Sequence, residues 1–148
     1  MQSLIPGILL ESLITVMSVP DILKRRIPLW MLPGLSVPVA VQIVFFVMQG
    51  GEIGHRLIVM GLGMIPGLVL MVTGRITKKV GLADGIVLCV IGMTEGARGA
   101  LMILCAGCFI LSLVSMILLA MKKVRKETCL PFIPFMGLGF LIWRLVII

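Results

Sequence analysis

The sequence predicts an all-α membrane protein of about six transmembrane helices with both termini outside the cytoplasm. Of the 148 residues, 60% are apolar and only 13% are charged, whereas a soluble domain carries about 45–50% and about 25%. The charged residues form short clusters between almost purely apolar stretches. Six membrane helices use about 120 residues, so residues 1–148 form a single transmembrane domain without an extramembrane domain. This pattern excludes a soluble domain, a disordered chain and a nucleic-acid-binding module, despite the net charge of +7.

The apolar stretches give the expected helices in order. They cover residues 4–20, 29–48, 56–73, 82–95, 98–121 and 130–148, and charge clusters separate them. Residues 1–7 lack the basic residues of a signal peptide, so we expect the first helix to be retained. The small residues of Gly63-Met-Ile-Pro-Gly67 and Gly92-Met-Thr-Glu-Gly96 predict close packing between helices.

The basic residues predict the orientation. Ten of the 13 lie in the first, third and fifth loops: Lys24, Arg25, Arg26, Arg75, Lys78, Lys79, Lys122, Lys123, Arg125 and Lys126. Only Arg56, Arg98 and Arg144 lie on the other side. Cytoplasmic loops carry the excess of Lys and Arg, so these three loops are expected to face the cytoplasm and to contact anionic lipid. Trp30 and Trp143 are then expected near opposite membrane surfaces.

The fourth expected helix is unusually short. About 14 residues separate Gly81 from Glu95, which is roughly 21 Å of helix against a hydrocarbon core of about 30 Å. Either the bilayer thins there, or the helix starts inside a water-filled recess. Asp84 stands at its start.

The chain contains two aspartates, Asp21 and Asp84, and both fall at the cytoplasmic ends of expected helices. Ionisable groups at membrane depth are functional candidates by default. Two carboxyls close together share a proton, so that one activates a water and the other protonates a carbonyl oxygen or leaving amine. That is the chemistry of an aspartic protease, and it needs no metal or organic cofactor. The alternative is that each aspartate only caps a helix or pairs with Lys24, Arg25 or Lys79.

The surroundings of both aspartates resemble a known family. Asp21-Ile-Leu-Lys-Arg-Arg-Ile-Pro28 resembles the segment after the first core helix of type IV prepilin peptidases. Gly81-Leu-Ala83-Asp84-Gly85 resembles their GxGD motif, and Pro131-Phe-Ile-Pro134-Phe resembles the opening of their last helix. The three segments agree in order and spacing, so the resemblance spans essentially the whole chain.

The resemblance implies an intramembrane aspartyl endopeptidase of the GxGD class. Such enzymes remove the short, basic leader of prepilins or pseudopilins at the cytoplasmic membrane face. By this matching, Asp21 and Asp84 correspond to the catalytic pair, and Gly81, Ala83 and Gly85 to the motif around the second acid. The implied partners are a prepilin-like substrate with a hydrophobic helix and the lipid bilayer, and the implied localisation is the plasma membrane. The chain lacks the domain linked to N-methylation, so we expect cleavage without methylation.

Three positions depart from the family pattern. Ala83 replaces the second motif glycine, Ile86 stands where many members carry lysine, and Leu29 replaces an asparagine. A left-handed backbone at Ala83 costs about 1 kcal/mol or more, whereas a right-handed one is harmless. Two alternative functions follow: a non-enzymatic component of a pilus or secretion assembly that keeps the peptidase fold, or a small transporter. The sequence makes no prediction of the oligomeric state.

The remaining polar residues are expected to be structural. Glu11 lies midway along the first helix, either protonated, paired across the bundle or in an accessory role. Glu52 and His55 are expected in a solvated outer loop, and Pro131 and Pro134 at the start of the last helix. The four cysteines (Cys89, Cys105, Cys108 and Cys129) lie within or beside apolar stretches, so we expect them to pack rather than to bind metal.

Overall fold

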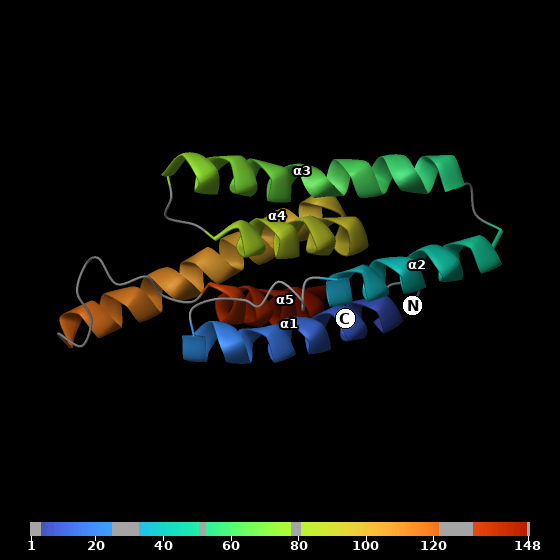
Figure 1. Ribbon diagram of the computed structural model, residues 1–148. Helices are drawn as coiled ribbons and strands as arrows, with labels where there is room; N and C mark the ends of the chain where they lie inside the picture. The colour runs from blue at the N-terminus through green and yellow to red at the C-terminus, as the bar shows by residue number, and fades with distance from the viewer. Residues whose placement is uncertain (1–3, 25–32, 51–52, 78–80, 122–131, 148) are drawn as a thin grey trace.

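The computed structural model describes residues 4–24, 33–50, 53–77, 81–121 and 132–147, and their regular structure is helical, as predicted. Figure 1 shows the helices lying side by side along one long axis. The helices are α1 (Leu4–Lys24), α2 (Ser36–Met48), α3 (Ile53–Thr77), α4 (Leu82–Ala120) and α5 (Ile133–Ile147). Of these, α3 and α4 are long and apolar enough to cross a membrane, by length and composition.

The second helix is shorter than predicted. The sequence predicts a membrane helix over residues 29–48, but α2 begins at Ser36 and has 13 residues; residues 29–32 lie outside the described part. A short 3-10 turn at 33–35 precedes it. Pro33 and Gly34 disfavour an earlier helix start, and Pro38 is tolerated because it sits in the first turn. At about 1.5 Å per residue, α2 spans only about 20 Å, so the prediction of a full-length second crossing is wrong.

A glycine divides α4 into two. Gly96 has φ 79° and ψ 171°, a non-helical backbone inside the long helix that glycine alone adopts readily. Figure 1 shows that the second part of α4 runs back toward the end where α4 begins. The break falls between the predicted helices 82–95 and 98–121. The amide of Gln42 on α2 donates a hydrogen bond of 3.0 Å to the Thr94 carbonyl just before the break, which satisfies one of the carbonyls that a helix end leaves free.

Close glycine contacts join α3 to the first part of α4. A Cβ on Gly63 would collide with the carbonyl oxygen of Gly92, and a Cβ on Gly92 with that of Gly63. A side chain at Gly67 would strike Cys89 in the same way. The predicted role of the Gly63–Gly67 pattern in helix packing is therefore confirmed. In the second pattern Gly92 makes the contact, and Gly96 makes the break.

The buried core lies between α1, α4 and α5. Its buried side chains are Leu10, Ile14 and Met17 on α1, Leu35 just before α2, Val87, Leu88, Ile91, Ala100 and Ile103 on the two parts of α4, and Ile133, Met136 and Phe140 on α5. This core fixes the relative positions of three helix ends. The end of α1 and the starts of α4 and α5 lie at one end of the molecule (Figure 1).

Candidate active site

Asp21 lies in the last turn of α1 and joins it to α5. Its side chain is buried, with 8% of the residue exposed, and its Oδ2 accepts a hydrogen bond of 3.3 Å from the backbone N–H of Ile133. Ile133 is the first residue of α5, where backbone N–H groups have no partner within the helix. The carboxylate therefore accepts a hydrogen bond from an N–H group that has no acceptor within α5. Its negative charge also interacts favourably with the positive end of the helix dipole.

The burial of Asp21 also affects its ionisation. Asp21 lies beyond Gly7–Val19, the apolar stretch of α1. Burial raises the pKa of Asp21, and the hydrogen bond from Ile133 opposes part of that rise. Both effects are expected from desolvation of a carboxylate and from a donor that favours its charged form.

Asp84 lies in the first turn of α4, three residues after the helix cap. Gly81 precedes the helix in an extended conformation, and its backbone N–H donates a hydrogen bond of 3.2 Å to Asp84 Oδ2. An acidic residue that bonds back to the cap in this way stabilises a helix start. Gly85 is buried against Met71 of α3, where an added Cβ would collide with the methionine. Gly81 thus positions Asp84 through its backbone N–H, and Gly85 allows the start of α4 to pack closely against α3.

Ala83 fits its position without strain. The residue lies in the first turn of α4, with right-handed helical backbone. Alanine is the best helix former at such a position. The departure from the GxGD pattern therefore carries none of the backbone penalty that a left-handed conformation would bring.

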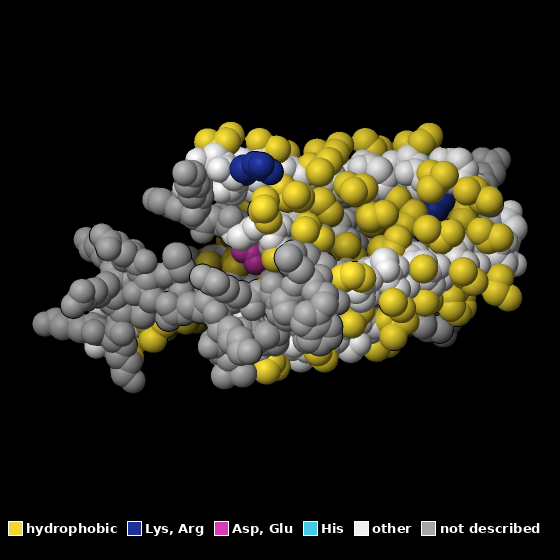
Figure 2. Space-filling model, in the orientation of Figure 1, with side chains coloured by type: hydrophobic (Ala, Val, Ile, Leu, Met, Phe, Trp, Pro, Cys, Tyr) yellow, Lys and Arg dark blue, Asp and Glu magenta, His cyan; other side chains and the backbone are white. Residues whose placement is uncertain are grey.

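The fold brings Asp21 and Asp84 to the same end of the molecule. Asp21 lies in the last turn of α1 and Asp84 in the first turn of α4, and these two helix ends lie at the same end of the molecule although the residues stand 63 positions apart in the chain. Figure 2 shows acidic side-chain atoms at this end, near the start of α4. Two interacting carboxyls can hold one proton between them, and such a pair can supply both a general base and a general acid.

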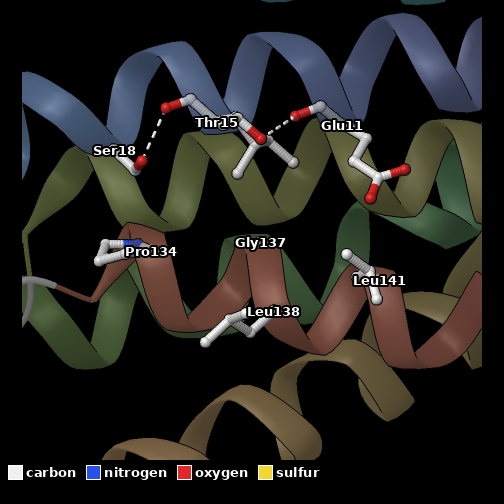
Figure 3. A pocket seen from close by; sticks show the side chains of 8 residues that line it. Glu11, Thr15, Ser18, Pro134, Gly137, Leu138 and Leu141 are labelled. Carbon is white, nitrogen blue, oxygen red and sulfur yellow. Dashed lines mark hydrogen bonds between the residues drawn. The ribbon is translucent and has the colours of Figure 1, made fainter.

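A groove lies beside this site, between α1 and α5. Its volume is about 370 Å³. Figure 3 shows its walls, with the Glu11 carboxylate pointing from α1 toward α5. The lining residues come from one face of each helix: Glu11, Ile14, Thr15 and Ser18 on α1, and Pro134, Gly137, Leu138 and Leu141 on α5. Sequence analysis singled out Glu11 and Pro134 but did not place them together.

A second charged cluster lies at the opposite end of the core. Glu95, just before the break in α4, forms an ion pair with Arg144 of α5 at 3.4 Å, and their side chains are only 7% and 11% exposed. The indole N–H of Trp143 donates to Glu95 at 3.4 Å, and the Arg144 guanidinium lies 5.6 Å from the centre of the Phe140 ring. A Cβ on Gly7 would collide with that guanidinium. Sequence analysis missed this pair; the signal was two opposite charges at span ends on the same predicted side.

Other predicted residues lie apart from the aspartates or outside the described ranges. His55 is exposed at the start of α3. Cys89 is buried against Gly67, whereas Cys105 and Cys108 are exposed and unbridged. Within the described ranges, no group of three His, Cys, Asp or Glu side chains could hold a metal ion. The residues named in the predictions that fall outside these ranges are Arg25, Arg26, Leu29, Trp30, Glu52, Lys78, Lys79, Lys122, Lys123, Arg125, Lys126, Cys129 and Pro131.

No protein-family model, no curated protein and no solved structure matches this chain.

Proposed function

We propose that this chain is a membrane-embedded aspartyl endopeptidase that removes the short leader of prepilin-like or pseudopilin proteins. The observation that carries the proposal is the convergence of Asp21 and Asp84, the two aspartates of the sequence, at one end of the helical core. Both stand in segments that resemble the catalytic segments of type IV prepilin peptidases.

The surface supports a place in the membrane. A long apolar helix can also be the core of a soluble protein, but such a helix is mostly buried. Only 22% of the most apolar window of α3 and 11% of that of α4 are buried inside the protein. Hydrophobic side chains cover the visible flank between the two ends (Figure 2). An apolar surface of this extent is stable against lipid rather than water.

The helix ends support a multi-pass arrangement in the plasma membrane. Arg75 lies in the last turn of α3, at the end that holds the two aspartates. Arg56 and Arg144 belong to the opposite end, where α3 begins and α5 ends, and Arg98 follows the break in α4. With the remaining basic residues in the first, third and fifth loops, the positive-inside rule directs the aspartates to the cytoplasm. In this arrangement α2, with 13 residues, is too short to span the membrane as a helix.

The chemistry follows from two acids in different surroundings. Asp21 is held by the Ile133 N–H, and Asp84 by the Gly81 N–H. In the proposed reaction the ionised carboxyl takes a proton from a water as that water attacks the peptide carbonyl carbon. The protonated carboxyl donates its proton to the carbonyl oxygen, which gives a tetrahedral diol. The carboxyl that took the water proton then donates it to the leaving amine, while the other carboxyl takes a proton from a diol hydroxyl as the C–N bond breaks. Hydrolysis returns the pair to a single shared proton.

The test is leader removal from a co-expressed prepilin, followed on a gel. Asp21→Asn and Asp84→Asn should each abolish cleavage, because each amide keeps an oxygen that accepts the existing backbone hydrogen bond but cannot act as acid or base. Both variants should insert and unfold at temperatures near that of the wild type.

A matched acid-to-amide control is Glu95→Gln at the opposite end of the core. It should lose stability but keep its cleavage rate per folded molecule. Wild-type cleavage by either aspartate variant would show that the pair is not catalytic.

A further inference from the structure

The groove between α1 and α5 has a shape that could accommodate one helix. Its α1 residues stand at positions 11, 14, 15 and 18, and its α5 residues at 134, 137, 138 and 141. Both sets have the spacing of a single helix face. The walls therefore run along the helix axes for about two turns, or roughly 10 Å. Gly137 forms part of the floor, where a Cβ would already approach Ile14 to 3.3 Å.

The groove contains one carboxylate, that of Glu11. No described residue donates a hydrogen bond to the Glu11 carboxylate. The nearby hydroxyls are engaged elsewhere: Thr15 donates to the Glu11 carbonyl at 2.8 Å, and Ser18 donates to the Thr15 carbonyl at 2.6 Å (Figure 3). Midway along an apolar helix, a carboxyl without a donor is unfavourable. An occupant that brings a donor is therefore favoured over one that is purely apolar.

The groove leads toward Asp21. Its end at Ser18 and Pro134 adjoins Asp21 and Ile133, the residues that share the hydrogen bond between α1 and α5. Ten residues separate Glu11 from Asp21 along α1, which is about 15 Å of helix. An occupying helix that lies along α1 would place its end at Asp21 and its tenth residue beside Glu11.

We propose that this groove receives the transmembrane helix of the substrate, and that this helix carries a hydrogen-bond donor about ten residues beyond the cleaved bond. The proposal rests on the proposed peptidase function. A lipid chain fits the apolar walls but brings no donor to the depth of Glu11. A second copy of this chain would cover the route to Asp21. A substrate helix with an Asn, Gln, Ser or Thr at that depth satisfies the carboxylate and delivers its N-terminal bond to the aspartates.

The first experiment measures docking without cleavage. Proteoliposomes contain the Asp84→Asn variant with a photoreactive benzoylphenylalanine at Leu138, inside the groove, or at Leu145, an exposed residue elsewhere on α5. The probes are synthetic leucine-rich single-span peptides with a basic leader, carrying Asn at position ten, Asn at position five, or leucine throughout. We expect capture from Leu138 only, about threefold or more stronger for Asn at position ten.

The second measurement asks whether Glu11 sets this preference. Glu11→Leu should remove the difference between the peptides, whereas Glu11→Gln, which keeps an acceptor, should retain part of it. Equal capture of all peptides, or crosslinks only to lipid or to a second copy of the chain, would overturn the proposal.

A blocking variant separates this proposal from the peptidase function. Gly137→Phe fills the groove, and Gly61→Phe places the same side chain on α3, where nothing lies within 4 Å of the added Cβ. The first should slow prepilin cleavage and peptide capture together, and the second should change neither. If peptide capture depends on Glu11 but no prepilin is cleaved, the docking proposal is supported and the proposed peptidase function is wrong. If Gly137→Phe and Glu11→Leu both cleave prepilin at the wild-type rate, the peptidase function is supported and the docking proposal is wrong.

Discussion

The backbone N–H of Ile133 donates a hydrogen bond of 3.3 Å to the carboxylate of Asp21, across 112 positions of sequence. This bond joins the last turn of α1 to the first residue of α5. It holds the Asp21 side chain at the end of the core where α4 begins, and Asp84 lies in the first turn of α4. One interaction thus supports the packing of two helices and holds one member of the proposed catalytic pair.

Replacing Asp21 should separate its structural role from its chemical one. Asp21→Ala leaves the buried Ile133 N–H without an acceptor, which should lower the free energy of unfolding by about 1–3 kcal/mol. Asp21→Asn keeps an acceptor oxygen and should cost much less. Thermal or denaturant unfolding in detergent measures both. Equal losses in the two variants would show that the hydrogen bond does not hold the helices together.

The stability of the protein should depend on pH through Asp21. Because burial raises the pKa of Asp21 in the folded state, the folded protein binds more protons than the unfolded chain between the two pKa values. Stability linked to this group is therefore intact below the unfolded pKa, about 3.9, and falls as pH rises through the folded pKa. Asp21→Asn removes this dependence.

The measurement is the difference in unfolding free energy between Asp21→Asn and wild type at a series of pH values. We expect that difference to shift in favour of the variant as pH rises from about 4, and then to level off. A difference that stays constant across the series would contradict the assignment.

Removing one partner of the ion pair between Glu95 and Arg144 should strongly destabilise the opposite end of the core. Removing one partner of a buried pair costs about 3–5 kcal/mol, because the other charge stays buried. Glu95→Gln should fall near the lower end of that range, since the Arg144 guanidinium also lies over the Phe140 ring. A double-mutant cycle with Arg144→Gln measures the coupling. A coupling near zero would mean that the two charges act independently.

A side chain at Gly96 should be destabilising because of the backbone conformation there, not because of steric contact with neighbouring atoms. Its φ of 79° lies outside the range that other residues adopt readily, and nothing lies within 4 Å of an added Cβ. Gly96→Ala should therefore destabilise by about 1–3 kcal/mol through strain. The matched control is Gly61→Ala within α3, also with open space around the added Cβ, which should stabilise by about 0.5–1 kcal/mol. Loss of stability in both would point to a packing effect instead.

The regular structure could be read from composition and from single residues. Long apolar stretches indicated helices, and the break in α4 at Gly96 falls between the predicted helices 82–95 and 98–121. The start of α2 was predicted too early, because the apolar stretch continues through Pro33 and Gly34, and hydrophobicity outweighed their effect on the backbone. Asp21 and Asp84 could be proposed as a pair because both stand at span ends on the same predicted side.

The sequence by itself determined that the chain is helical and apolar, and that its two aspartates lie at helix ends. These properties depend on local composition and on residues close together in the chain. The tertiary structure alone decided that Gln42 bonds to the Thr94 carbonyl, that Ile133 bonds to Asp21, that Glu95 meets Arg144, and that Glu11 points into a groove. Each of these contacts joins surfaces from different helices. Their partners are selected by how whole helix faces pack together, a property that no stretch of sequence carries alone.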